Sequence, residues 1–348
     1  MVGMRDVAKK AGVSLSTVSL VVNGNGYVSN DMRDRVRKAM QALNYVPNEL
    51  ARNLYHDRTN LVGVIVPTIR HPFFATFTAH LQHALAAQGL CTMLCSTADE
   101  ADGEIQYVDM LRRHMMDGIV MCAHTSHPGD YWTSIHRPIV AFDRVLGDGI
   151  SSIGSDHEQG GRLISQMLIR SGARHVVMIG GPRDQFFDLG KTTFPTVRYY
   201  LTLEQELTAA GVKYEYIEAG EVMDFAGYHR AVDKALDGVA TDGVDAVVSS
   251  DIGAAFCVRE ALGRGISIPG ELQVVAYDGT YLTDLAGMKL TAVAQDFSAI
   301  AQSAAAHVVQ AIANEEAAAV NASRKNKPKP FEPNVLIPMT LMPGDTTR

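Results

Sequence analysis

Apolar and polar positions follow two different patterns along the chain. Up to residue 47, apolar residues recur three and four positions apart, which is the spacing of short helices that bury one face. From Leu61 onward, apolar runs of five to seven residues alternate with longer amphipathic stretches. Such runs are typical of buried strands, and the stretches between them have helical spacing. The change of pattern predicts a small all-helical unit followed by a larger unit of strands and helices.

The first 47 residues predict three short helices. The first covers 6–11 and ends at Gly12, a residue suited to the left-handed position after a helix. Ser14 and Ser29 are good N-caps for the second and third helices, and Pro47 ends the third. The apolar residues of these two helices that should face inward are Val18, Val21, Val22, Met32, Val36, Ala39, Met40 and Leu43.

Seven apolar runs between residues 61 and 277 predict strands, with helical patterns among them. Strand and helix in alternation favour parallel sheets flanked by helices, and there are more such units than one sheet of ordinary width needs. We therefore expect two α/β lobes. The expected strands are 61–66, 90–95, 118–122, 138–142, 175–179, 246–250 and 272–277, with a last one at 335–339. The expected helices are about 72–88, 103–115, 157–171, 196–210, 224–238 and 252–263.

Length and composition restrict the class of protein. A chain of 348 residues, 47% of them hydrophobic, is long enough for two or three folding units. The first residues lack an apolar signal segment and no apolar run could span a bilayer, so we expect a cytoplasmic protein without a membrane partner. We expect the four cysteines to be buried free thiols. Cys91 and Cys95 share one expected strand and would lie roughly 13 Å apart, too far for a disulfide.

Charge is distributed unevenly along the chain. The whole chain has a formal net charge of −7, yet residues 1–60 hold nine Lys and Arg against five Asp and Glu, a net charge of +4. The remaining 288 residues hold 22 bases against 33 acids, a net charge of −11. A basic surface confined to one end is what a module that binds a polyanion requires.

The first two predicted helices and the turn between them suit a helix-turn-helix. Such a unit needs a tight turn before its second helix, which enters the major groove and directs its first side chains toward base edges. The run 6–19, DVAKKAGVSLSTVS, contains both, with Gly12 in the turn. This run closely resembles the head of the lactose/galactose repressor family. The resemblance continues at Val28-Ser29, Arg35-Val36, Ala39, 43–48 and 51–54.

This resemblance places the DNA-reading residues at the start of the second helix. It makes Leu15 and Ser16 the side chains that read bases, with Thr17 and Ser19 near phosphates or base edges. Leu20 stands where the family often has arginine. A leucine can touch a thymine methyl group but cannot make a bidentate contact with guanine. The operator sequence therefore cannot be transferred from better-known relatives.

Residues 48–55 resemble the family's hinge helix, and a linker extends to residue 60. The resemblance implies a hinge that folds only when two subunits meet on DNA, with Asn48, Ala51, Arg52 and Leu54 as its DNA-contacting positions. Leu54 would be an apolar wedge between base pairs in the minor groove. The alternative is an ordinary linker whose leucine packs against the core.

The core resembles the same family, and also the periplasmic sugar-binding proteins, whose two lobes close on a ligand. The absence of an export signal favours the regulator. The family places its ligand cleft at the carboxyl ends of the strands, where open α/β sheets bind ligands on general grounds. Carboxylates and a guanidinium suit vicinal hydroxyl groups because each makes paired, charge-assisted hydrogen bonds. The matching cleft positions are Asp156, Arg198, Asp251 and Asp278, with Phe297 as an aromatic wall and Phe73 as a further candidate.

The predicted ligand residues could have other roles, and the sequence departs from the family pattern at one position. Each acid could instead cap a helix or lie in a solvated loop, above all Asp251, which directly precedes an expected helix. Val222 stands where sugar-binding relatives often place a stacking aromatic ring. The loop 182–195 contains Phe186, Phe187 and Phe194 and could supply that ring.

Signatures of common enzymes are absent from the sequence. It has no Gly-x-Gly-x-x-Gly after a strand, no Walker loop, no Gly-x-Ser-x-Gly elbow and no His-Glu-x-x-His. His124 and His127 give at most a weak suggestion of a metal site. We therefore expect neither an enzyme nor a resident cofactor or metal.

The functional hypothesis is a sequence-specific transcription regulator, most simply a repressor. It would bind a double-stranded DNA operator as a homodimer and respond to a small-molecule effector, with a sugar as first choice. The alternatives within the family are a purine-type regulator that needs a corepressor and a catabolite-control regulator that answers to a phosphorylated carrier protein.

The expected domains follow from these assignments. They are a helix-turn-helix domain at 1–47, a hinge and linker at 48–60, a two-lobed core at 61–342 and a tail at 343–348. Within the core, the first lobe should cover about 61–156 and 291–320, and the second about 157–290 and 334–342. The tail has no heptad repeat that could form a four-helix coiled coil, so we expect a dimer rather than a tetramer.

Overall fold

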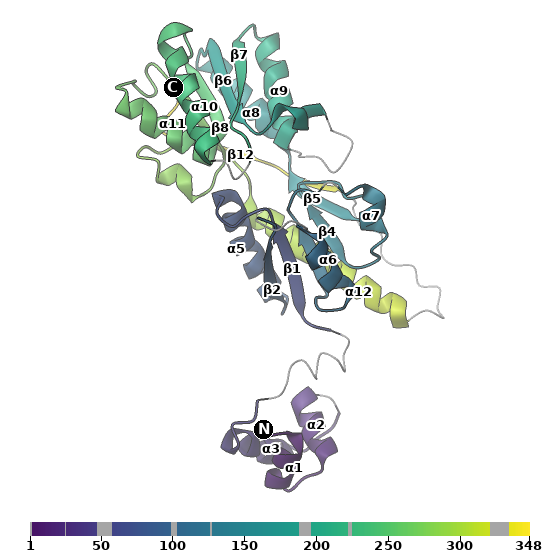
Figure 1. The fold of residues 1–348 in the computed structure, drawn as a ribbon. Coiled ribbons are helices and arrows are strands. Elements are labelled where there is room, and N and C mark those ends of the chain that lie inside the picture. Colours follow the sequence, from purple (N-terminus) through teal and green to yellow (C-terminus); the bar gives the residue numbers. More distant parts are fainter. Residues whose placement is uncertain are drawn as a thin grey trace. The chain divides into compact units, whose positions relative to one another are not determined.

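The computed structural model describes residues 2–24, 26–46, 58–98, 103–125, 127–187, 196–221, 225–320 and 334–348. It contains two compact units, Met1–Thr59 and Asn60–Arg348 (Figure 1). The hinge positions Asn48, Ala51, Arg52 and Leu54 lie outside the described residues, as do Phe194 and Val222.

The described residues of the first unit form a bundle of three helices, α1 Met4–Ala11, α2 Leu15–Asn23 and α3 Asn30–Ala42. Both predicted serine caps are present. Ser14 Oγ accepts a hydrogen bond from the main-chain N–H of Thr17 at 3.1 Å, and Ser29 Oγ accepts one from that of Met32 at 3.4 Å. The buried side chains between the helices are Val7, Ala8, Ala11, Val18, Val36 and Ala39.

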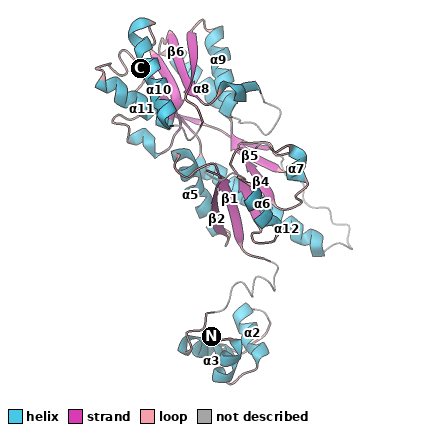
Figure 2. Cartoon of the chain, viewed as in Figure 1, coloured by secondary structure: helices cyan, strands magenta, loops and turns pink. Residues whose placement is uncertain are grey.

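The second unit contains two six-stranded sheets flanked by helices (Figure 2). Neighbouring strands are parallel except β12, which runs antiparallel to β10. The first sheet, in spatial order, is β11 Asn334–Ile337, β5 Ser151–Ser155, β4 Ile139–Phe142, β3 Gly118–Met121, β1 Leu61–Val66 and β2 Cys91–Ser96. The second is β12 Thr340–Met342, β10 Thr291–Ala294, β9 Gln273–Asp278, β8 Ala246–Ser250, β6 His175–Gly180 and β7 Lys213–Glu218.

Each sheet and its helices form one lobe. In the first lobe, α12 packs against α5 through a shared core that includes Phe77, Leu81, Ile300 and Val308. The first-lobe helices are α5 Pro72–Ala87, α6 Ile105–Arg112, α7 Gly129–Thr133 and α12 Phe297–Val320. The second-lobe helices are α8 His157–Arg170, α9 Thr196–Ala209, α10 Phe225–Thr241 and α11 Asp251–Gly263, with short 3-10 turns η1 Arg183–Phe187 and η2 Tyr281–Asp284. The predicted fold class, a helical head and a two-lobed α/β core, is confirmed.

Among the described residues, the chain crosses between the lobes three times, at 155–157, 294–297 and 337–340. The expected lobe boundaries are therefore wrong in two places. Residues 291–294 form β10, which pairs with β9 in the second sheet, and only α12 returns to the first lobe. Residues 334–337 form β11, which pairs with β5 in the first sheet.

The single strand expected at 335–339 is in fact two short strands, one in each sheet, because the chain crosses over between them. Three strands have no counterpart among the predicted elements. β5 contains one large apolar residue, Ile153, and β10 is only four residues long. β7 lies at an edge of its sheet and alternates between exposed and partly buried positions, so it lacks a continuous apolar run.

The expected tail is integrated into the second lobe. Thr346 is fully buried, its Oγ1 donates a hydrogen bond to Val274 O at 2.6 Å, and the main-chain N–H of Thr291 donates to that Oγ1 at 2.9 Å. The tail assignment for 343–348 is thus wrong, because these residues satisfy polar groups of β9 and β10.

The four cysteines do not share one environment. Cys95, Cys122 and Cys257 are buried free thiols, as expected. Cys91 is free but exposed, because it opens the edge strand β2. No helix among the described residues is long and apolar enough to cross a membrane.

Candidate functional site

A cavity with about 990 Å³ of empty space, which includes its open mouth, lies between the two lobes. It lies at the carboxyl ends of strands from both sheets, which is where open α/β sheets generally bind ligands. Phe142 ends β4 on one side, and Gly180, Ser250 and Asp278 end β6, β8 and β9 on the other. Both lobes therefore contribute to one binding space.

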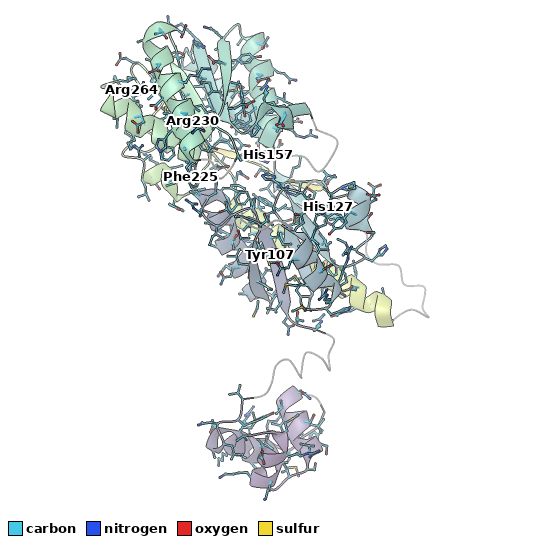
Figure 3. All side chains as sticks on the ribbon, viewed as in Figure 1. Tyr107, His127, His157, Phe225, Arg230 and Arg264 are labelled. Carbon is cyan, nitrogen blue, oxygen red and sulfur yellow. The ribbon has the colours of Figure 1, made fainter. Side chains whose placement is uncertain are left out.

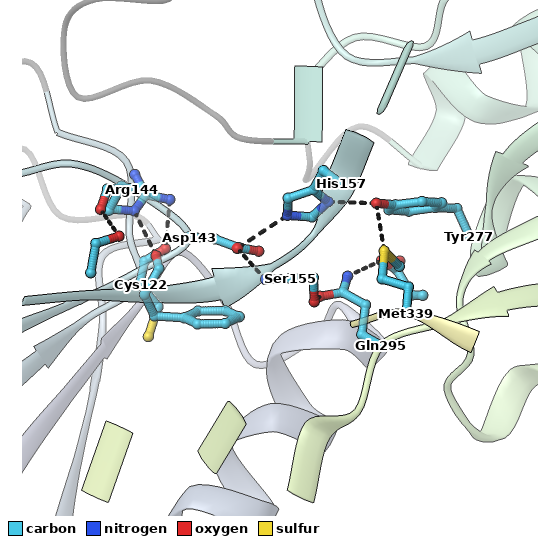
Figure 4. Close-up of polar contacts among 11 residues, drawn as sticks. Cys122, Asp143, Arg144, Ser155, His157, Tyr277, Gln295 and Met339 are labelled. Atoms are coloured by element: carbon cyan, nitrogen blue, oxygen red, sulfur yellow. Dashed lines mark hydrogen bonds and ion pairs between the residues drawn. The ribbon is translucent and has the colours of Figure 1, made fainter. Parts of the chain in front are cut away.

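The buried imidazole of His157 connects the lobes next to this cavity (Figures 3 and 4). Its Nε2 lies 3.1 Å from Oδ1 of Asp143, in the first lobe, and its Nδ1 lies 2.5 Å from Oη of Tyr277, in the second. The same Asp143 oxygen accepts the main-chain N–H of Ser155 at 3.2 Å. Asp143 and Tyr277 both line the cavity, so the connection between the lobes is part of its wall.

A second hydrogen-bonded path runs beside the first. Ser155 Oγ donates to Oε1 of Gln295 at 2.7 Å, and Nε2 of Gln295 donates to Oδ1 of Asp278 at 2.9 Å (Figure 4). These residues occupy two of the three crossings and the end of β9. Elsewhere, the Arg70 guanidinium of the first lobe lies 5.4 Å from the ring centroid of Phe225 in the second.

Two glycines make this close approach possible. A Cβ atom at Gly154 would overlap the Asp143 carboxylate. One at Gly160 would lie 2.7 Å from Sδ of Met339 and 3.2 Å from the ring of Tyr277. A larger residue at position 154 would displace Asp143, and one at position 160 would displace Tyr277, so either would disturb a partner of His157.

Aromatic side chains dominate the second-lobe wall of the cavity. The hydroxyl of Tyr200 donates to Ile179 O at 2.9 Å, and that of Tyr216 donates to Gly181 O at 2.7 Å. Burial raises the pKa of both tyrosines, so they remain neutral phenols. Gly180 lies directly beneath their hydroxyl groups, where a Cβ atom would not fit.

Burial shifts the pKa of several ionisable groups of the cavity. Burial lowers the pKa of His71 to about 4 and the pKa of His124 well below its ordinary value, so both rings are uncharged at neutral pH. Burial and the nearby carboxylate of Asp251 raise the pKa of Asp278 well above its ordinary value. In this environment Oδ1 of Asp278 accepts a hydrogen bond from the side-chain amide of Gln295.

Arg144 is the cation of the first-lobe wall. Burial lowers its pKa to about 10, which still leaves the guanidinium charged at neutral pH. Its Nε donates to Phe142 O at 3.2 Å and its Nη2 to Cys122 O at 2.9 Å. These bonds fix the turn that presents Asp143 to the crossing.

The structure brings two of the six predicted ligand residues to the cavity, Phe73 and Asp278. Phe297 packs in the first-lobe core, with its ring centroid 5.5 Å from that of Phe73. Asp156 caps α8 by accepting the main-chain N–H of Gln159 at 2.9 Å.

The other two predicted ligand residues have protein partners. Asp251 accepts hydrogen bonds from the main-chain N–H groups of Gly279 and Thr280, at 3.2 and 2.6 Å, and so holds the loop after Asp278. The half-exposed Arg198 donates to Oε1 of Glu158 at 3.1 Å. Neither is among the residues that line the cavity.

Sequence reasoning missed Asp143, Arg144, His157, Tyr277 and Gln295. The first two directly follow the predicted strand 138–142, so the rule that ligand groups follow strands could have found them. Gln295 follows β10, which was not predicted. His157 carries no sequence signal of its own, because its role arises only from the crossing.

The predicted DNA-reading residues lie along α2. Leu15, Ser16 and Leu20 are exposed, and Thr17 and Ser19 are partly exposed. Ser16 Oγ lies 2.7 Å from the capping hydroxyl of Ser14. The Leu20 side chain lies close to Gly26.

No group of three His, Cys, Asp or Glu side chains among the described residues could hold a metal ion. His127 stacks on Tyr131, with ring centroids 4.0 Å apart.

Comparison with known proteins gives three family matches. Residues 3–48 match bacterial regulatory proteins of the lacI family. Residues 59–188 match the periplasmic binding proteins and sugar binding domain of the LacI family, and residues 165–347 match a periplasmic binding protein-like domain.

Relatives match over most of the chain. The sucrose operon repressor of Streptococcus mutans is 32% identical over 298 residues, which cover 86% of this chain and 89% of that protein. The ribose operon repressor of Bacillus subtilis is 33% identical over 281 residues, 80% of this chain and 82% of that protein. The crystal structure of the Lac repressor dimer bound to operator and the anti-inducer ONPF covers 99% of both chains, with a TM-score of 0.80 and 21% identity. That last likeness concerns the fold alone.

The lowered pKa of His71 predicts a specific loss of stability in acid. Its folded pKa of about 4 lies below the ordinary 6.5, so the unfolded chain takes up the proton first as the pH falls. Between pH 7 and pH 5 this residue should lower the free energy of unfolding by about 2 kcal/mol.

His71→Asn should remove that part of the pH dependence and still cap α5, as Nδ1 of His71 does by accepting the N–H of Phe73 at 3.3 Å. Urea unfolding of both proteins at pH 7 and pH 5 measures the difference. Equal losses of stability in the two proteins would contradict the assignment of a buried, neutral His71.

Proposed function

Because this chain belongs to the lacI family of bacterial regulatory proteins, we propose that it is a repressor that binds a near-palindromic operator as a homodimer. A sugar bound between its lobes would control its affinity for the operator. This proposal is carried by the occurrence of two features in one chain. The basic head exposes one face of α2, and the core has a cavity between two lobes that are joined by hydrogen bonds.

Membership in the lacI family confirms the family assignment that the sequence motifs indicated. It also confirms that the chain is a DNA-binding transcription regulator with a periplasmic-binding-protein-like core, and that it is not an enzyme. We place it in the cytoplasm, because a repressor acts where its operator is.

The proposed DNA contacts are those predicted for α2 and the hinge. Leu15 and Ser16 are exposed at the N-terminal end of α2, which is the part of a recognition helix that meets base edges. Thr17, Ser19 and Leu20 extend this face. For 48–55 the proposal is a helix that forms on DNA in the dimer, with Leu54 as the wedge in the minor groove.

A homodimer is supported by an apolar surface on the second lobe. Leu262 of α11 and Tyr281 and Leu285 around η2 are large and exposed, and α11 packs against η2. Large exposed apolar side chains that lie together mark protein contact surfaces, and Tyr281 and Leu285 are neighbours at η2. Two copies of the chain would also present two heads together, as a near-palindromic operator requires.

A sugar is supported by the chemistry of the cavity. Asp143, Asp278 and Gln295 offer carboxyl and amide groups to hydroxyl groups, and the aromatic wall suits the apolar faces of a sugar ring. Repressors of a sucrose operon and a ribose operon are among the relatives of this chain. Arg198 and Asp251 remain predicted ligand contacts that would require a rearrangement, since both now have protein partners.

Substitutions on α2 should weaken operator binding selectively. Leu15→Ala and Ser16→Ala should each lower the affinity for a genomic operator fragment about tenfold, because a direct base contact is lost, and should leave non-specific binding unchanged. Gln41→Ala, at an exposed position of α3, is the matched control. Fluorescence anisotropy at two salt concentrations separates the two kinds of binding. If both α2 variants bound the operator like the native protein, this face would not be the one that reads bases.

Removing the acid at the end of β9 should weaken effector binding. Isothermal titration of sugars and purine bases against the native protein identifies the ligand class, and Asp278→Asn should lower its affinity between tenfold and a hundredfold, about 1.4 to 3 kcal/mol. Asp284→Asn, an exposed position nearby in sequence, should have no effect, whereas Arg198→Ala tests the second predicted contact. Binding of a purine base and of no sugar would overturn the sugar assignment and leave the DNA-binding assignment intact.

A further inference from the structure

One cluster of aromatic rings in the cavity lies several strands away from the polar groups of Asp278 and Gln295, although Tyr277 on β9 is also aromatic and also lines the cavity. Asp278 ends β9 and Gln295 follows β10, whereas Gly180 ends β6 and Tyr216 belongs to β7. The strand order is β10-β9-β8-β6-β7 across this part of the sheet. Since neighbouring strands are about 4.8 Å apart, Gly180 lies about 10 Å from Asp278 across the sheet, and β7 lies farther still. A single sugar ring held at Asp278 would lie beside Tyr277 and leave the part of the cavity at the ends of β6 and β7 for a second group.

Three rings at that far end form what we call the aromatic shelf: Phe186, Tyr200 and Tyr216. All three line the cavity. The Phe186 ring meets that of Tyr216 edge to face at a centroid distance of 5.1 Å, and that of Tyr200 at 5.8 Å. The hydroxyl groups of both tyrosines donate to main-chain oxygens. The shelf therefore offers ring surface rather than free hydroxyl groups to a ligand.

Arg183 does not line the cavity, but it contacts two rings of the aromatic shelf and holds them in place. Its guanidinium carbon lies 4.2 Å from the ring centroid of Phe186 and 5.0 Å from that of Tyr216. Both terminal nitrogens of the guanidinium donate to the Glu204 carboxylate, and the main-chain N–H of Arg183 donates to Oε1 of Glu218 at 2.9 Å. A bidentate ion pair and two cation–π contacts thus hold η1 in place.

The charges of the lining disfavour an anionic ligand. Of the described residues that line the cavity, Arg144 is the only Lys or Arg, and it donates to the main-chain oxygens of Phe142 and Cys122. A phosphate would need several such donors. Asp143 and Glu221 add negative charge to the lining.

We propose that the effector is an uncharged glycoside of two linked rings, a disaccharide in the simplest case, with one ring at Asp278 and Gln295 and the second on the aromatic shelf. The flat apolar face of a sugar ring packs on an aromatic ring, and the shelf is rigid before the ligand arrives, so little ordering is needed on binding. Phe186 is then the residue that distinguishes a disaccharide from its component sugars. This inference rests on the proposed sugar-controlled function.

The test is isothermal titration of three disaccharides, sucrose, cellobiose and maltose, and of glucose and fructose, against three full-length proteins. These are the native chain, Phe186→Leu and Phe256→Leu. The control is closely matched, because Phe256 also lies under a guanidinium, that of Arg259 at 5.2 Å, but on α11 outside the cavity lining. Thermal unfolding of each protein confirms that it is folded, and leucine preserves most of the apolar volume.

The native protein should bind one disaccharide at least tenfold more tightly than either of its component sugars. Phe186→Leu should lower the affinity for that disaccharide about tenfold and leave the monosaccharide affinity unchanged, whereas Phe256→Leu should bind like the native protein. If a monosaccharide bound as tightly as every disaccharide, or Phe186→Leu bound the disaccharide like the native chain, the two-ring effector would be wrong and a sugar-controlled repressor would remain. Failure of every sugar to bind would overturn both.

Discussion

The hydrogen bonds of His157 are the constraint on which the arrangement of the core depends. One buried ring nitrogen meets a carboxylate of the first lobe and the other meets a phenol of the second, at the first of three crossings. With Nε2 protonated toward Asp143, Nδ1 accepts the Tyr277 hydroxyl, so both buried partners are satisfied. A buried polar network of this kind fixes a single geometry, because each broken contact leaves a desolvated group unpaired. The angle between the lobes is therefore set by these side-chain hydrogen bonds rather than by the chain segments that cross between the lobes.

Residues of this hydrogen-bonded network also line the ligand cavity. A bound ligand can therefore act on the contacts that hold the two lobes together. Asp143, Tyr277, Asp278 and Gln295 each face the cavity and each take part in hydrogen bonds at or beside the crossings. Under the proposed function, a hydroxyl-bearing ligand that binds to them would exchange hydrogen bonds with the network and so shift the balance between lobe arrangements. A ligand can shift such a balance only by the difference in its affinity for the two arrangements. The cavity wall thus links effector chemistry to the geometry that the core presents to the rest of the chain.

Local signals made the head and most strands predictable. Ser14 and Ser29 cap their helices as the sequence indicated, and continuous apolar runs such as Leu61–Val66 became central strands. Strands with little apolar content, such as β5 and β7, could not be found by that signal, because sheet neighbours rather than their own residues stabilise them. The assignment of β10 and β11 to lobes failed for a similar reason, since a crossing leaves no local mark.

The ligand residues show the same limit. Asp278 and Phe73 were found through the resemblance to the family, whereas Asp143 and Arg144, which directly follow β4, were not singled out. Asp156 and Asp251 were indistinguishable in sequence from ligand groups, yet one caps a helix and the other holds a loop. His157 and Tyr277 meet across 120 residues of chain, and only the folded core shows that they touch.

The most direct test of this account is the thermodynamic linkage between the two sites. The affinity of the effector is measured by titration into the free protein and into the protein saturated with its operator duplex, and operator affinity is measured with and without saturating effector. We expect effector affinity to differ at least about fivefold between the two forms, and operator affinity to change by the same factor. Equal effector affinity for the free and the operator-bound protein would contradict it.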